Sequence, residues 1–259
     1  TWVHTEDVRK IWRPSEFATD LSVIAIPNIP FGSVEIEKNI PEIRQPEQNR
    51  VAFIIANDQY SGELSERIYG DRDAALMDEY FTQALGVREN RVISSMNINS
   101  QSVLERGFSR LTNAVTDSTH AVSIYISGYG AVQDSTAFLV GSNNESANSV
   151  SAMIDLKRIF ESIASLKVRS LSVFVDLDFI RGSASMDMYE ELASTVTENP
   201  NSAVIFSTGP DQRSGIYSSS FGEHNRHSIF TYYLAEAIKQ GKITIEPKMV
   251  TGMFSTVPT

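Results

Sequence analysis

The chain from residue 50 onward alternates between two hydrophobic patterns. Short continuous apolar runs, rich in β-branched side chains, are typical of buried strands. Apolar residues that recur every three or four positions predict amphipathic helices between these runs. The predicted strands are residues 51–56, 91–96, 121–127, 137–141, 170–176, 202–207 and 243–246. The predicted helices are residues 71–85, 100–115, 151–166 and 227–239, the second with Ser100 as its cap and the last with Tyr233 facing inward.

This alternation favours a three-layer α/β sandwich, in which a mostly parallel central sheet has helices on both faces. We place this domain at residues 50–247, after a proline-rich arm at residues 1–49 and before a tail at residues 248–259. Prolines block long helices and central strands, so we expect the arm to add an edge strand or to cover the domain. The alternative for the arm is a partly ordered linker.

Charge and composition narrow the function classes. The chain has 32 acidic and 22 basic residues, and this balance repels phosphate backbones and anionic lipids. We therefore expect no nucleic-acid partner and no membrane insertion. The chain has no cysteine, which excludes a disulfide framework, a thiolate metal site and a cysteine nucleophile. Because the sequence begins at Thr1, we expect a processed chain or a fragment of a longer, soluble protein.

Candidate chemistry gathers where two of the apolar runs end. One run continues into Asp176-Leu177-Asp178, and another ends in Ser127-Gly128-Tyr129-Gly130. The carboxyl ends of parallel strands lie at one edge of a sheet and commonly hold the site of an α/β protein. We therefore expect a site at these two strand ends.

These motifs resemble those of the caspase-like cysteine peptidases, especially the bacterial and metacaspase-type proteins. Ser127-Gly128-Tyr129-Gly130 is similar to the family's Ser-Gly-His-Gly, and Asp176-Leu177-Asp178 is similar to its Asp-Ala-Cys. Tyr129 precedes Asp178 by 49 residues, which agrees with the ~50 residues between the histidine and the cysteine of caspases. Further segments resemble the family in the same order, at residues 57–60, 70–74, 205–207 and 227–233.

The resemblance implies that this domain has lost both catalytic residues. Tyr129 stands at the position of the family's histidine, and Asp178 stands at the position of its cysteine. A tyrosine phenol, with an ordinary pKa of ~10, is a poor base near neutrality, and a carboxylate is a far weaker nucleophile than a thiolate. We therefore expect an inactive pseudo-peptidase with no catalytic residue and no cofactor.

The resemblance also suggests a binding role. In metacaspase-like relatives the aspartate two positions before the cysteine helps to form an acidic pocket for a basic side chain, and Asp176 matches that position. With Asp58 and Ser127, Asp176 is our candidate for binding a peptide with a basic residue; the alternative is that backbone amides satisfy Asp176. We expect a protein-binding or scaffolding module of a larger bacterial protein, cytoplasmic or periplasmic, that self-associates through unpaired sheet edges.

Other interpretations of the same residues stay open. Asp176-Leu177-Asp178 also resembles the first motif of haloacid-dehalogenase-type phosphatases, in which the first aspartate attacks phosphorus, the second is acid and base, and Mg²⁺ assists. Ile180 stands where that motif has Thr or Val. A residual hydrolase, a phosphoacceptor domain that uses Asp58, and Ca²⁺ binding are further alternatives. His224 and His227 lack a third metal ligand, and His120 is expected at the surface or at a strand edge.

Overall fold

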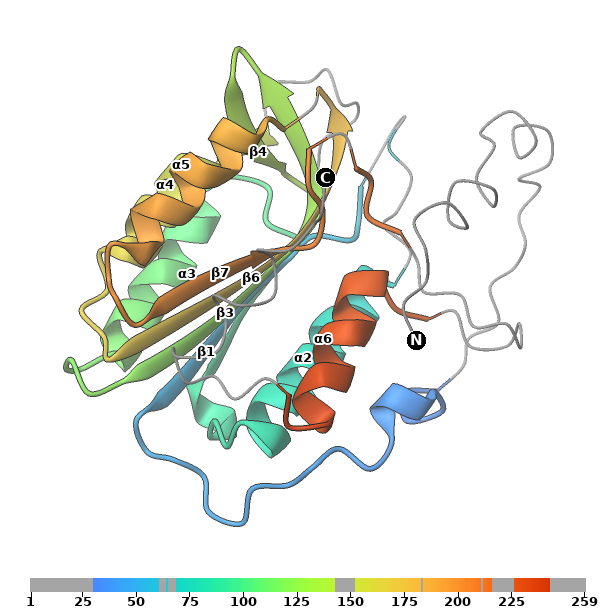
Figure 1. Cartoon of the computed structure of the whole chain (residues 1–259), viewed down its shortest axis with the longest axis vertical. Helices are drawn as coiled ribbons and strands as arrows, with labels where there is room; N and C mark the ends of the chain where they lie inside the picture. The colour runs from blue at the N-terminus through green and yellow to red at the C-terminus, as the bar shows by residue number, and fades with distance from the viewer. Residues whose placement is uncertain are drawn as a thin grey trace, which may run out of the picture.

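The computed structural model of the chain describes residues 30–60, 64, 69–142, 152–182, 184–210, 212–215 and 226–242. Within these residues, one open sheet of seven strands lies between two layers of helices (Figure 1). The strands are β1 (Arg50–Ala56), β2 (Val92–Met96), β3 (Ala121–Gln133), β4 (Thr136–Val140), β5 (Met153–Asp155), β6 (Ser170–Arg181) and β7 (Ser202–Phe206). The α-helices are α2 (Gly70–Glu79), α3 (Gln101–Ala114), α4 (Leu156–Ala164), α5 (Met186–Thr197) and α6 (Ile229–Lys239).

Three short helical segments complete the described structure. They are the 3-10 turns η1 (Glu35–Glu37) and η3 (Glu89–Arg91) and the π-helical turn η2 (Tyr80–Ala84), which continues α2. None of the helices in the described part of the chain is both long enough and apolar enough to cross a membrane.

The sheet is mostly parallel, as the alternation of strands and helices predicts. Its parallel strands lie in the order β2-β1-β3-β6-β7. β4 and β5 extend it through antiparallel pairs at the far end of β3. The central strands β3 and β6 are the longest, and their ends project beyond the carboxyl end of β1.

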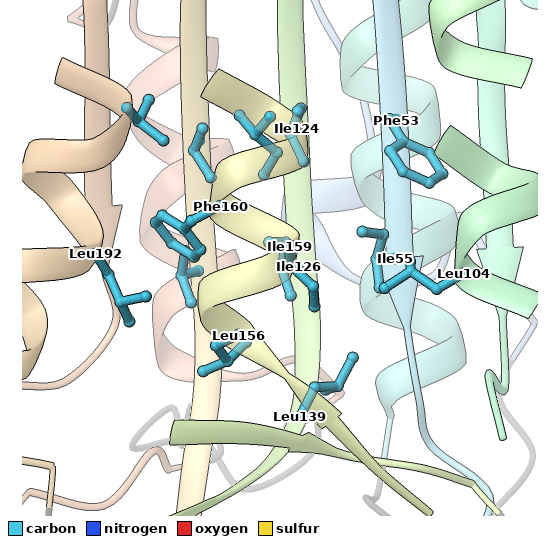
Figure 2. Packing of buried hydrophobic residues seen from close by; sticks show 14 of the residues in the cluster. Phe53, Ile55, Leu104, Ile124, Ile126, Leu139, Leu156, Ile159, Phe160 and Leu192 are labelled. Atoms are coloured by element: carbon cyan, nitrogen blue, oxygen red, sulfur yellow. The ribbon is translucent and has the colours of Figure 1, made fainter. Parts of the chain in front are cut away.

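Successive side chains of each strand point to opposite faces, and each face supplies one half of the core. On β1, Phe53 and Ile55 belong to a core cluster that also contains Leu104 of α3 and residues of α4 and α5, whereas Ile54 belongs to the cluster on the other face, with residues of α2 and α6. Figure 2 shows Phe160 and Ile159 of α4 directed at the first of these faces. Helices on both faces confirm the predicted three-layer sandwich.

The described part of the N-terminal arm, residues 30–49, contains η1 and no strand. It covers the α2 side of the domain: the Tyr80 hydroxyl donates to the Ile36 carbonyl at 2.8 Å, and the Ile43 amide donates to the Gln83 carbonyl at 2.9 Å. Residues 1–29 and 243–259, which include the predicted last strand and the tail, lie outside the described residues. The domain boundaries therefore stay predictions.

The structure corrects one predicted element and decides another that the sequence leaves open. Residues 153–155 form β5 and pair with β4, so the helix expected from residue 151 begins only at Leu156. Residues 186–197, for which the sequence leaves an irregular or a helical stretch open, form the regular helix α5, which Ser185 caps by accepting a hydrogen bond from the Met188 amide.

Three burial predictions were wrong. Every residue of β7 is only half-buried, because β7 pairs with β6 alone among the described strands and so forms an edge of the described sheet. Tyr233 faces outward with 53% of its surface exposed. His120, expected near the surface, is buried, with Nε2 3.1 Å from Arg91 Nη1.

Candidate functional site

The two polar strand ends lie side by side at the centre of the sheet. β3 and β6 are parallel neighbours, and their register pairs Ser127 with Asp176 and Tyr129 with Asp178. Register partners in a parallel sheet point to the same face, which for these four residues is the face covered by α2 and α6. The structure therefore brings together the two positions that the sequence analysis matched to the family's histidine and cysteine.

Glycines on β3 let neighbouring side chains pack closely against the strand beside the site. A Cβ on Gly130 would lie 2.7 Å from Phe179 Cδ1, and a Cβ on Gly128 would lie 2.9 Å from Leu139 Cδ1 and 3.1 Å from the Tyr60 hydroxyl. These distances are too short for a side chain. The glycines of the Ser-Gly-Tyr-Gly motif thus have a packing reason as well as a place in the motif.

The backbone and ring of Tyr129 are held by Tyr60. The Tyr60 hydroxyl accepts a hydrogen bond from the Tyr129 amide at 3.0 Å and donates one to the Asn57 carbonyl at 3.2 Å. The two tyrosine rings pack with their centroids 4.7 Å apart. Tyr129 is therefore part of an aromatic pair that closes one side of the site.

The carboxylate of Asp178 is bound by two consecutive residues of the segment before α6. Arg213 donates to it in a bidentate pair, from Nε to Oδ1 at 2.6 Å and from Nη2 to Oδ2 at 3.0 Å. The Ser214 amide adds a longer hydrogen bond to Oδ1 at 3.3 Å. Hydrogen bonding to Asp178 raises the pKa of Arg213 above its usual range. Asp178 is therefore the anionic half of an ion pair.

Asp176 is fully buried, and its two oxygens accept hydrogen bonds from two serine hydroxyls. Ser214 Oγ donates to its Oδ1 at 2.9 Å, and Ser228 Oγ donates to its Oδ2 at 2.6 Å. Ser228 is the N-cap of α6, and its Oγ also accepts a hydrogen bond from the Thr231 amide at 3.1 Å. Serine hydroxyls thus bind both oxygens of Asp176. The sequence predicted a basic peptide or backbone amides as the partners of this side chain.

Ser228 connects this site to a buried charge network. Its amide donates to both oxygens of Asp73 on α2, at 3.2 and 3.1 Å. Asp73 Oδ1 lies 2.8 Å from His227 Nδ1, and Glu37 Oε1 lies 3.0 Å from His227 Nε2. Arg72 donates to both oxygens of Glu37. The network therefore joins the arm, α2, the start of α6 and Asp176.

The charges of this network follow from its geometry. Each ring nitrogen of His227 faces a carboxyl oxygen, and two ionised carboxylates there favour the imidazolium form, in which both nitrogens donate. Burial alone would lower the pKa of His227, but the hydrogen bonds to Asp73 and Glu37 outweigh it and raise this pKa. Burial alone would raise the pKa of Glu37, but hydrogen bonds from His227 and Arg72 lower it to about 2.

The other predicted binding residues lie beside the pair of strand ends. Ser127 is fully buried on β3, next to Asp176. Asp58 follows β1, so β3 separates it from Asp176; its Oδ1 is buried and has no hydrogen-bond partner in the described part of the chain. Asn57, just before it, ties β1 to the Ile98 and Val140 carbonyls and is structural.

Metal and phosphatase chemistry find little support here. Among the described residues, no group of three or more His, Cys, Asp or Glu side chains is arranged to hold a metal ion, and His224 lies outside those residues. The Asp176 and Asp178 carboxylates are occupied by Ser228, Ser214 and Arg213. The haloacid-dehalogenase alternative is therefore unsupported.

Sequence reasoning missed the residues that complete the site. Arg213 and Ser214 lie in a glycine- and serine-rich stretch that carries no motif, 35 and 36 residues after Asp178. Glu37 lies in the proline-rich arm, 190 residues before His227. No local sequence pattern links Arg213, Ser214 or Glu37 to partners so distant in the chain. Only the folded structure shows that these residues belong to the site.

Comparisons with known proteins agree with this architecture. The family model for the caspase domain matches residues 49–257. A comparison with curated proteins found no match. Among solved structures, protein GSU0716 from Geobacter sulfurreducens is similar with a TM-score of 0.51 and 13% identity, over 76% of this chain and 84% of that one, which shows a shared fold. Since the family model covers most of the sequence, the chain belongs to the caspase domain family.

Proposed function

We propose that this caspase domain binds protein or peptide partners and does not cleave them. The observation that carries the proposal is the Asp178–Arg213 ion pair beside Tyr129, at adjacent strand ends. Cysteine peptidases need a thiolate nucleophile and a base that takes up its proton. The matched positions here hold a carboxylate and a phenol.

The bidentate contact further lowers the reactivity of Asp178. Both oxygens of Asp178 accept hydrogen bonds from Arg213, and these bonds withdraw electron density from the carboxylate and weaken it as a nucleophile. Neutralisation by a guanidinium also stabilises the carboxylate relative to its ester. The ion pair thus argues against Asp178 as the nucleophile of a peptidase dyad.

Charge and sheet edges favour a binding role. The formal net charge of −10 attracts basic partners, so a peptide with a basic residue is the ligand we propose. β7 pairs only with β6 among the described strands, and an unpaired strand edge presents backbone donors and acceptors to a second strand. We propose self-association through this edge as the route to scaffolding.

Restoration of the dyad tests the proposal. Wild-type protein and the double variant Tyr129→His with Asp178→Cys are compared on fluorogenic peptides that end in Arg or Lys and on a phosphate ester. We expect no turnover by wild type and iodoacetamide-sensitive peptide cleavage by the double variant. Wild-type turnover of either substrate that disappears in Asp178→Ala would overturn the proposal.

A further inference from the structure

Two consecutive residues, Arg213 and Ser214, occupy both strand-end aspartates at once. Arg213 binds both oxygens of Asp178, while Ser214 contributes its amide to Asp178 and its hydroxyl to Asp176. A side chain and a backbone amide directed at neighbouring carboxylates are the contacts that an extended peptide would make with this site. The segment thus binds the site in the manner of a ligand.

The two aspartates differ in how their partners are held. Asp176 is fully buried, and its Ser228 partner belongs to the cap of α6, so this contact is part of the framework. Asp178 is 8% exposed, but the Arg213 side chain that neutralises it is 56% exposed. A buried carboxylate needs a cationic partner, and here the partner comes from the solvent side.

The geometry selects the chemistry of that partner. The planar fork of a guanidinium matches both oxygens of one carboxylate, whereas an ammonium group presents a single point charge. The Nε–Oδ1 and Nη2–Oδ2 contacts are this fork arrangement. Asp178 is therefore shaped for a guanidinium rather than for any cation.

We propose that Asp178 is a guanidinium-binding site whose resident ligand is Arg213, and that an arginine of a partner binds there only when it displaces Arg213. The inference rests on the proposed binding function, and the contact that controls binding is the Arg213–Asp178 ion pair. Because Arg213 is tethered, its effective concentration at Asp178 is in the millimolar range or higher. The intact chain therefore binds external arginine weakly.

Replacement of the resident side chain tests this inference. Arg213→Ala removes the atoms that ethylguanidinium supplies, so ethylguanidinium at about five times its dissociation constant should raise the melting temperature of this variant by about 2–4 °C. Ethylammonium, the matched cation without a fork, should have little effect on it. Wild type and the double variant Arg213→Ala with Asp178→Asn should respond to neither compound.

Peptide affinity gives the second readout. A capped tripeptide with a central arginine should bind Arg213→Ala at least about tenfold more tightly than it binds wild type, because the tethered competitor is gone. Arg213→Lys, which keeps the charge without the fork, should fall between the two and covers the case in which Arg213→Ala does not fold. Equal affinities, or equal melting shifts with both compounds, would overturn the inference.

These outcomes are separate from the test of peptidase activity. Wild-type turnover would refute the proposed function but would leave the ethylguanidinium response unchanged. Loss of the ethylguanidinium response would instead show that Arg213 is a fixed structural partner, in a domain that still does not cleave.

Discussion

At the scale of single residues, His227 carries the charge balance of the buried network. Its imidazolium lies between Asp73 and Glu37 and is 1% exposed. Removal of one partner from a buried ion pair leaves the other charge uncompensated. The contribution of His227 to stability should therefore be large and should depend on pH.

His227→Gln should lower the free energy of unfolding by roughly 3 kcal/mol at pH 6. Because its pKa is raised in the folded state, His227 stabilises the protein fully below its ordinary pKa of about 6.5, and this contribution is lost as the pH rises through the folded pKa. Urea unfolding of both proteins from pH 6 to pH 10 should show the difference shrinking. Arg158→Gln, which removes an exposed charge, is the control and should differ little from wild type at either pH.

Gly130 tests the packing on the face of the sheet opposite the site. Gly130→Ala should destabilise the protein by about 1–3 kcal/mol, because the new methyl group overlaps the Phe179 ring. Gly209→Ala, whose Cβ would lie 3.5 Å from its nearest neighbour, is the matched control and should change stability by less. Equal melting temperatures for the two variants would show that β3 and β6 separate easily at this end.

The sequence predicts a site residue when that residue lies in a motif. It does not predict a residue that reaches the site only through the fold. Tyr129 and Asp178 were found because each ends an apolar run. Asp58 and Ser127 were predicted in the same way. The register places Ser127 directly beside Asp176, whereas Asp58 is separated from Asp176 by β3. Arg213 acquires its role only through a contact between distant segments, which no local pattern encodes.

At the scale of elements, hydrophobic runs predicted the strands but not their ends. β3 and β6 continue past the apolar runs because they pair with each other as far as Ala131 and Arg181, and β3 then continues to Gln133 by pairing with β4. The hydrophobic pattern predicts residues 153–155 as part of a helix. These residues acquire strand geometry only by pairing with β4. Pairing between strands therefore determines the ends of β3 and β6 and the strand geometry of β5, which local propensity does not fix.

The helix caps give a prediction at this scale. Asp155 accepts a hydrogen bond from the Lys157 amide at the start of α4, whereas Ser100 stands at the start of α3 but makes no such bond. Asp155→Ala should therefore cost about 1 kcal/mol of unfolding free energy, and Ser100→Ala should cost clearly less. Thermal melting of the two variants provides the comparison, and a larger loss for Ser100→Ala would contradict the assigned caps.

At the scale of the whole molecule, the arm is tied to the domain through Glu37. Its carboxylate accepts from the Val34 amide within the arm and from Arg72 on α2, and it contacts His227 before α6. The folded domain thus includes at least part of the proline-rich arm. The described part of the arm therefore packs against α2 and the start of α6.

Glu37 should also set the acid limit of stability. Its pKa falls from 4.5 to about 2 on folding, which corresponds to roughly 3 kcal/mol that is present above pH 4.5 and is lost as the pH falls towards 2. Glu37→Gln should remove this part of the acid dependence in urea unfolding between pH 7 and pH 2. Glu42→Gln, at an exposed arm position, should leave the acid dependence unchanged.

The proposed function requires that this caspase domain does not cleave peptides. The most direct measurement is mass spectrometry of an unbiased peptide library after prolonged incubation with the purified wild-type chain, with Asp178→Ala in parallel. We predict the same peptides before and after incubation for both proteins. New peptide ends that wild type produces and Asp178→Ala does not would contradict the account.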